Sequence, residues 1–145
     1  MRKVRVLALI GMLLTANTLA TETEMQPIAK FLEGESTLSD AGVQFVGLRC
    51  HALFSILSAY SNDNGMPDKG ATFEKAGDVA LARAIEASKP LNQDFLQGQS
   101  KLMVDGYIQR WLKAKALTGN FSDDAVIYAD LPVCTQLFGK PQTNQ

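Results

Sequence analysis

Arg49, His51 and the two cysteines, Cys50 and Cys134, are the residues of this chain with the clearest potential for chemistry. Guanidinium, imidazole and thiol groups are the usual anion-binding, acid–base, metal-ligating and nucleophilic groups of proteins. His51 is the only histidine in the 145 residues. A single histidine excludes the HExxH metalloproteases, the three-histidine zinc sites and the Cys/His zinc fingers.

His51 falls on a narrow polar strip of the long helix predicted over residues 40–61. We therefore interpret it first as a solvent-facing histidine. The alternative is a single haem or metal ligand inside a helical bundle, with Met66 or Met103 as the opposite ligand. Covalent haem attachment requires a CxxCH motif, which the sequence lacks. The sequence therefore predicts no metal site and no cofactor.

Arg49 breaks the apolar arc of the same helix. A buried guanidinium must be paired, because an uncompensated buried charge is strongly destabilising. Asp130 and Asp105 are the two acids that we consider as partners. The alternative to this structural role is a contact with an anion or a partner, in which Arg49 clamps a negative group in a pocket.

No catalytic residue is predicted. The acidic pairs, Glu33 with Glu35 and Asp123 with Asp124, fall where turns are expected. Serine-nucleophile motifs and glycine-rich phosphate loops are missing from the sequence. An enzyme that uses carboxylates, or Arg49, in a groove between helices therefore stays as an alternative and not as the leading hypothesis.

The first twenty residues have the three parts of a cleavable signal peptide. Arg2, Lys3 and Arg5 precede an apolar run over residues 6–14, and small residues follow up to Ala20. Nine apolar residues span less than half of a hydrocarbon core of about 30 Å. We therefore expect cleavage after Ala20 and export to the periplasm or the medium, without a stable membrane anchor.

The predicted mature chain, residues 21–145, is a single domain of ordinary length. Residues 1–20 hold three of the 14 lysines and arginines and none of the 15 acids, so the remainder is acidic. A nucleic-acid binder needs a basic face, and this chain has no excess of cations with which to build one. We therefore expect no nucleic-acid partner.

The even number of cysteines predicts a disulfide in an oxidising compartment. With two cysteines, the pairing within one chain has to be Cys50 with Cys134. Closing a loop of this length stabilises a fold by about 4–5 kcal/mol in the chain-entropy model.

Helical periodicity recurs along the mature chain, and strand patterns are nearly absent. The pattern predicts helices over residues 24–33, 40–61, 72–88 and 92–118, a loop over 61–70 and a short last helix ending at Gly139. Asp130 is the predicted N-cap of this last helix, with Pro132 in its first turn. On the helix over residues 92–118, the predicted core face consists of Met103, Val104, Tyr107, Ile108, Trp111, Leu112 and Ala114.

These elements predict an all-α fold, a compact bundle of four to five helices with the disulfide joining the second helix to the last. The leading functional hypothesis is a non-enzymatic exported binding or interaction module whose partner is an envelope protein. A helical bundle that carries a small ligand or haem is the third hypothesis, and the sequence does not indicate which small ligand it would bind.

Overall fold

The computed structural model describes residues 25–90 and 92–139, and the predicted signal peptide lies outside this part of the chain. The described residues form helices and no strands, so the predicted all-α bundle is confirmed. The elements are α1 (Ile28–Leu32), α2 (Asp40–Asp63), α3 (Pro67–Ala87), α4 (Gln93–Thr118), the short 3-10 helix η1 (Phe121–Asp123) and α5 (Ala125–Phe138).

Helix α2 is the centre of the fold, as its broad apolar arc predicts. Ser39 caps its first turn by accepting a hydrogen bond from the amide of Gly42 at 3.2 Å. The helix is long and apolar enough to cross a membrane by length and composition, but 61% of the apolar window is buried inside the protein. The other helices cover α2, and this burial explains its composition.

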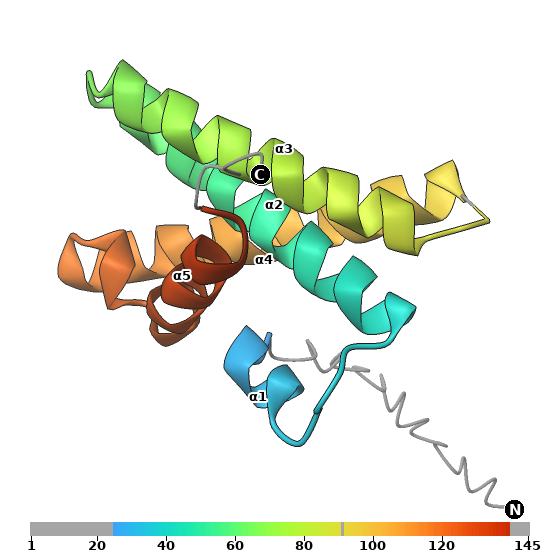
Figure 1. The fold of residues 1–145 in the computed structure, drawn as a ribbon. Coiled ribbons are helices and arrows are strands. Elements are labelled where there is room, and N and C mark those ends of the chain that lie inside the picture. The colour runs from blue at the N-terminus through green and yellow to red at the C-terminus, as the bar shows by residue number, and fades with distance from the viewer. Residues whose placement is uncertain (1–24, 91, 140–145) are drawn as a thin grey trace, which may run out of the picture.

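Helices α2 and α3 form a long antiparallel pair that runs across the molecule (Figure 1). Small residues allow the two backbones to approach closely. A Cβ atom on Gly47 of α2 would lie 2.7 Å from the carbonyl oxygen of Ala80 and 2.9 Å from the Cβ of Ala84. Ala80 and Ala84 are themselves fully buried. The small side chains of Ala80 and Ala84 therefore lie in the tight crossing with α2.

The loop predicted over residues 61–70 is wrong for most of its length. Helix α2 continues to Asp63 and α3 begins at Pro67, so that Asn64, Gly65 and Met66 alone connect them. Gly65 supplies the positive φ of the turn, at 72°. Pro67 occupies the first turn of α3, where a proline loses no helical hydrogen bond.

Helix α4 agrees closely with the predicted range. The side chain of Asn92 accepts a hydrogen bond from the amide of Phe95, and Gly119 ends the helix in the left-handed conformation, at a φ of 79°. Part of its predicted core face is at the surface instead. Ile108 and Leu112 are 39% and 56% exposed, because no described helix covers that side of α4.

The predicted start of the last helix is wrong. Asp124 is the N-cap of α5, where its carboxylate accepts hydrogen bonds from the amides of Val126 and Ile127 at 2.9 and 3.0 Å. Asp130 is therefore in the middle of α5 and Pro132 is inside the helix. The cap at Asp124 and the burial of Val126 and Ile127 in the core favour this earlier start, although Pro132 inside the helix is unfavourable.

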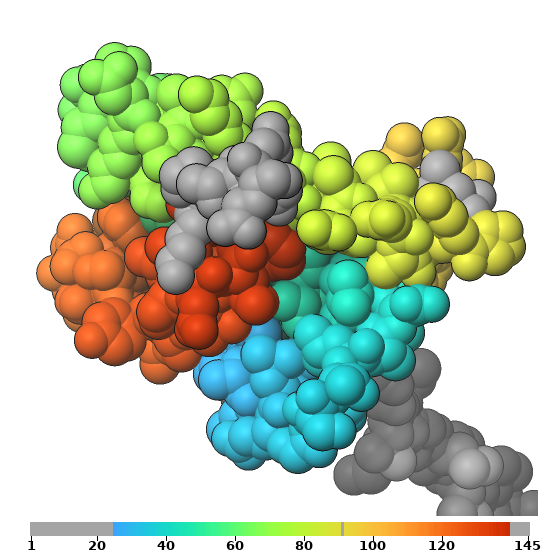
Figure 2. Space-filling model, in the orientation of Figure 1, coloured from blue at the N-terminus to red at the C-terminus, as the bar shows by residue number. Residues whose placement is uncertain are grey.

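Helix α1 is shorter than predicted, since it begins at Ile28 and ends at Leu32. It packs against α5, and Figure 2 shows its blue surface between the red surface of α5 and the cyan start of α2. Ile28 is the part of α1 that is fully buried in the core. A short helix with one buried residue depends on its contacts with the body of the protein for its position.

We predict that Gly47→Ala destabilises the protein by about 1–3 kcal/mol, because the added methyl group meets the backbone of α3. Gly98→Ala in α4 is the matched control, since a Cβ atom there has nothing within 4 Å. This second change should stabilise the helix by up to about 1 kcal/mol. Urea unfolding measures both changes, and equal effects at the two sites would contradict the tight crossing.

Candidate functional site

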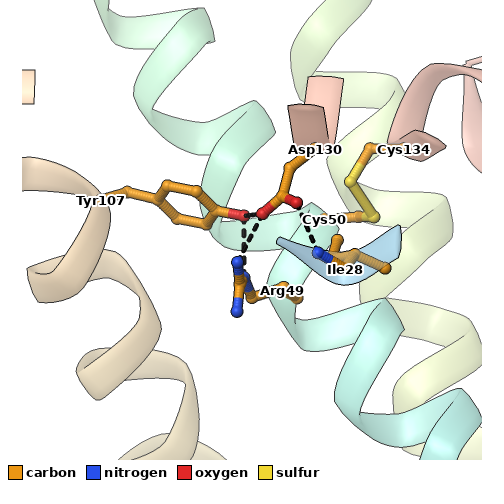
Figure 3. Close-up of a disulfide and its surroundings, with 6 residues drawn as sticks. All are labelled: Ile28, Arg49, Cys50, Tyr107, Asp130 and Cys134. Atoms are coloured by element: carbon orange, nitrogen blue, oxygen red, sulfur yellow. Dashed lines mark hydrogen bonds and ion pairs between the residues drawn. A yellow bond between two sulfur atoms is a disulfide. The ribbon is translucent and has the colours of Figure 1, made fainter. Parts of the chain in front are cut away.

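Arg49, Tyr107 and Asp130 meet at the centre of the protein (Figure 3). The guanidinium of Arg49 donates from Nε to the Tyr107 hydroxyl at 2.9 Å and from Nη2 to Oδ2 of Asp130 at 2.5 Å. The Tyr107 hydroxyl donates to the same Asp130 oxygen at 2.5 Å. Of the two acids considered for Arg49, Asp130 is its partner, whereas Asp105 pairs with Lys101 at the surface.

The three side chains of this buried network are 4%, 0% and 0% exposed for Arg49, Tyr107 and Asp130. Burial alone would lower the pKa of Arg49, but the neighbouring Tyr107 and Asp130 raise it above its usual value. Burial, together with the charge of Asp130, raises the pKa of Tyr107 far above the usual range of a tyrosine. Arg49 therefore stays charged and Tyr107 stays neutral across the physiological range.

The network also binds main-chain atoms near the start of the described chain. Arg49 Nη2 donates to the carbonyl oxygen of Gln26 at 2.8 Å, and Asp130 Oδ1 accepts from the amide of Ile28 at 2.6 Å. Among the described residues, no buried side-chain nitrogen or oxygen lacks a hydrogen-bond partner. The partners of Arg49 are thus atoms of the protein itself, although its role toward an outside anion stays a prediction.

The disulfide lies one residue from Arg49 along α2. Cys50 and Cys134 are bonded, with their Cα atoms 5.3 Å apart, and both are fully buried. The bond joins the second helix to the last, as the cysteine count and the predicted order of helices indicated. Together with the pair of Arg49 and Asp130, it fixes α5 to α2 at two neighbouring points (Figure 3).

His51 is half-buried between α2 and α3, and not fully solvent-facing. Its Nδ1 lies 3.1 Å from the carbonyl oxygen of Gly77, and because a carbonyl can only accept, Nδ1 carries the proton. The ring also lines an open pocket of about 530 Å³ between α2, α3 and α4, whose apolar walls are Leu48, Leu81, Ile85, Leu96 and Val104.

The haem hypothesis placed Met66 or Met103 opposite His51. Neither methionine lines this pocket. Met66 is 38% exposed just before α3, and Met103 is buried in the core. Within residues 25–90 and 92–139, no group of three or more His, Cys, Asp or Glu side chains is arranged to hold a metal ion.

A second open groove, of about 610 Å³, lies between the ends of α2 and α4 and the η1 turn. Three aromatic rings form its wall. Trp111 stacks on Phe121 with ring centroids 4.3 Å apart, and Tyr60 meets both rings edge-on at 4.9 and 4.8 Å. We call this surface the aromatic groove.

The aromatic groove has an apolar edge and a charged edge. Ile108 and Leu112 of α4 line it with exposed side chains. Asp63 at the end of α2 and Lys115 of α4 also line it, and both are exposed. The groove thus combines aromatic and aliphatic surface with one charge of each sign.

The sequence indicated this groove only in part. Trp111, Ile108 and Leu112 were all assigned to a core face. That face is wider than the neighbouring helices can cover, and this width was the signal for an exposed apolar surface. Phe121 belongs to the three-residue turn η1, which has no periodicity to read. Its stacking on Trp111 depends on the path of the chain after α4, which local patterns do not give.

Comparison with protein-family models, curated proteins and solved structures finds no match to this chain. The function is therefore argued from the geometry of the described residues.

We predict that the protein loses stability above about pH 10, where the unfolded chain releases the Tyr107 proton and the folded chain retains it. The folded state then binds more protons than the unfolded state, so the free energy of unfolding falls as the pH rises, by up to about 1.4 kcal/mol per pH unit. Urea unfolding between pH 7 and 11.5 measures this slope.

Tyr107→Phe should lower stability at pH 7, because the phenol bonds to Arg49 and Asp130 are lost, but it should flatten the alkaline slope. Tyr128→Phe is the matched control, since that ring is 74% exposed, and it should keep the wild-type curve. An unchanged slope in Tyr107→Phe would show that this hydroxyl does not cause the alkaline loss.

Proposed function

We propose that this protein is an exported, non-enzymatic interaction module that binds another envelope protein through the aromatic groove. The observation that carries the proposal is the cluster of Tyr60, Trp111 and Phe121 in an open groove. Tyrosine and tryptophan are the residue types most enriched among those that dominate binding energy in protein interfaces.

The occupant that fits the groove is a partner segment with a large apolar side chain. Ile108 and Leu112 would be covered by such a residue, as the apolar centre of an interface requires. Asp63 and Lys115 at the groove would face charges of opposite sign on the partner. Paired charges at the rim give orientation and specificity more than affinity.

The placement of Arg49 supports an interaction role over the alternative enzyme. Arg49, which the sequence offered as an anion-binding residue, is hydrogen-bonded to Asp130, Tyr107 and a main-chain carbonyl. These contacts stabilise the fold. The half-buried aromatic rings and the exposed Ile108 and Leu112 of the groove remain as the feature that calls for a partner. The disulfide between Cys50 and Cys134 supports the oxidising compartment that the proposal assumes.

We expect a photo-crosslinking amino acid at position 112 to capture one defined envelope protein in cells of the source organism. The same residue at position 128, an exposed site on α5 outside the groove, should not capture it. The affinity of the captured protein for the purified Leu112→Glu variant should fall at least about tenfold, because a charge would replace an apolar contact.

Leu102→Glu is the matched control for this measurement. Leu102 is 65% exposed on the same helix but does not line the groove, so its substitution should leave the affinity unchanged. Thermal unfolding shows that both variants are folded. If Leu102→Glu weakens binding as much as Leu112→Glu, or if position 128 captures the same protein, the groove is not the binding surface.

The pocket that His51 lines favours a second candidate function, the carriage of a small apolar ligand. Its walls come from three helices, and its volume of about 530 Å³ suits a small molecule. Aliphatic side chains supply most of the lining, and His51, Gln93, Gln97, Ser100 and Lys101 add polar groups. If the hypothesis is correct, native mass spectrometry of the protein from its own cells shows a bound adduct. Val104→Trp should fill the pocket and remove the adduct, and an adduct-free wild-type protein would refute carriage.

A further inference from the structure

Residues 25–28 are bound to the body of the protein through three successive main-chain contacts. The carbonyl of Met25 accepts from Arg110 Nη2 at 2.9 Å and that of Gln26 accepts from Arg49 Nη2 at 2.8 Å. The amide of Ile28 donates to Asp130 Oδ1 at 2.6 Å. Pro27, between them, has no amide proton and an extended backbone, with φ −55° and ψ 144°. Met25, Gln26 and Ile28 thus each bond through one main-chain atom to a charged side chain.

Two side chains of this segment fit into the body. Ile28 is 0% exposed and belongs to the core. Met25 packs over Gly106 of α4, where a Cβ atom would lie 2.5 Å from the Met25 methyl carbon. Gly106 therefore leaves room for Met25.

The side chains that bind residues 25–28 are held in place by contacts within the body of the protein. Tyr107 and Asp130 orient Arg49. Arg110 is held by an ion pair from its Nη1 to Oδ2 of Asp124, at 3.1 Å. The disulfide fixes α5, which carries Asp130, to α2, which carries Arg49. These contacts do not involve residues 25–28, so they can persist when the segment leaves.

The segment is joined to this site by an exposed connection. Residues 33–39 run from α1 to α2, and six of the seven are exposed, with Gly34 at a φ of 85°. Leu38 is the half-buried exception. Seven residues span up to about 25 Å when extended, which is long enough for the segment to reach a neighbouring molecule.

We propose that the surface of α2, α4 and α5 that contacts residues 25–28 is a peptide-binding site, and that the chain's own residues 25–28 are its ligand, replaceable by the same segment of a second copy. The ligand class is an extended peptide with an aliphatic residue directly after a proline. Recognition combines main-chain hydrogen bonds, which give affinity, with one buried side chain, which gives specificity. Exchange of an identical segment between two copies is a low-cost route to a dimer.

The experiment uses the chain from residue 21, the expected mature start, with a protease recognition sequence inserted between Gly34 and Glu35. The protein is folded and oxidised before it is cut. Both cysteines follow the cut, so the body keeps its disulfide. A fluorescent synthetic peptide of residues 21–34 is then added, and anisotropy and native mass spectrometry follow its exchange with the severed segment.

The labelled peptide should enter the body at a 1:1 ratio, and unlabelled peptide should compete with it. A peptide with Ile28→Asp should compete at least about 100-fold more weakly, because a carboxylate would enter an apolar site beside Asp130. A peptide with an N-methyl group on the Ile28 amide should compete about tenfold or more weakly, since it loses the bond to Asp130. Lys30→Ala is the matched control, because Lys30 is exposed, and it should compete normally.

Two results would overturn the proposal. The first is loss of the helical circular-dichroism signal after removal of the severed segment, because an unfolded body would make the segment a part of the fold and not a ligand. Equal competition by the Ile28→Asp peptide and the unmodified peptide would show that binding does not use this site. The aromatic groove uses other residues of the same half of α4, Ile108, Trp111 and Leu112, and is tested separately by Leu112→Glu.

Discussion

The ion pair of Arg49 and Asp130 is the interaction on which the arrangement of the helices depends. Two charges at the centre of a small protein are costly to bury, and their mutual attraction compensates only when further hydrogen bonds complete both groups. Here the Tyr107 hydroxyl and two main-chain groups, of Gln26 and Ile28, supply them. Residues of α2, α4 and α5 and the main chain at Gln26 and Ile28 thus all supply groups to the pair.

The disulfide and the ion pair constrain different features of the last helix. The bond from Cys50 to Cys134 is covalent and sets the distance between α2 and α5. Asp130, one helical turn before Cys134, sets the rotation of α5, because its carboxylate has to face both Arg49 and Ile28. Helix α5 has no basic residue and little polar surface of its own to orient it, so this directional contact decides which face is inside.

The helices could be predicted because they follow from local periodicity. The disulfide could be predicted because the sequence has two cysteines. The sequence also predicted that Arg49 needs an acid, and Asp130 was one of two candidates. The prediction that Asp130 is the N-cap of the last helix was wrong. An Asp two residues before a proline is a typical helix start, but the N-cap is Asp124, which lies outside that pattern. The aromatic groove depends on how η1 returns toward α2, a tertiary contact between Tyr60 and Phe121 that no local spacing encodes.

The attachment of residues 25–28 has a consequence for how the protein can evolve. Arg49, Arg110 and Asp130 contact main-chain atoms, which every amino acid carries, so the side chains at positions 25 and 26 are not what these residues recognise. Gln26 is exposed and free to vary, whereas Ile28 has to stay apolar and keep its amide proton. Position 26 can thus change in descendants of this chain while the three charged side chains that hold the segment stay constant.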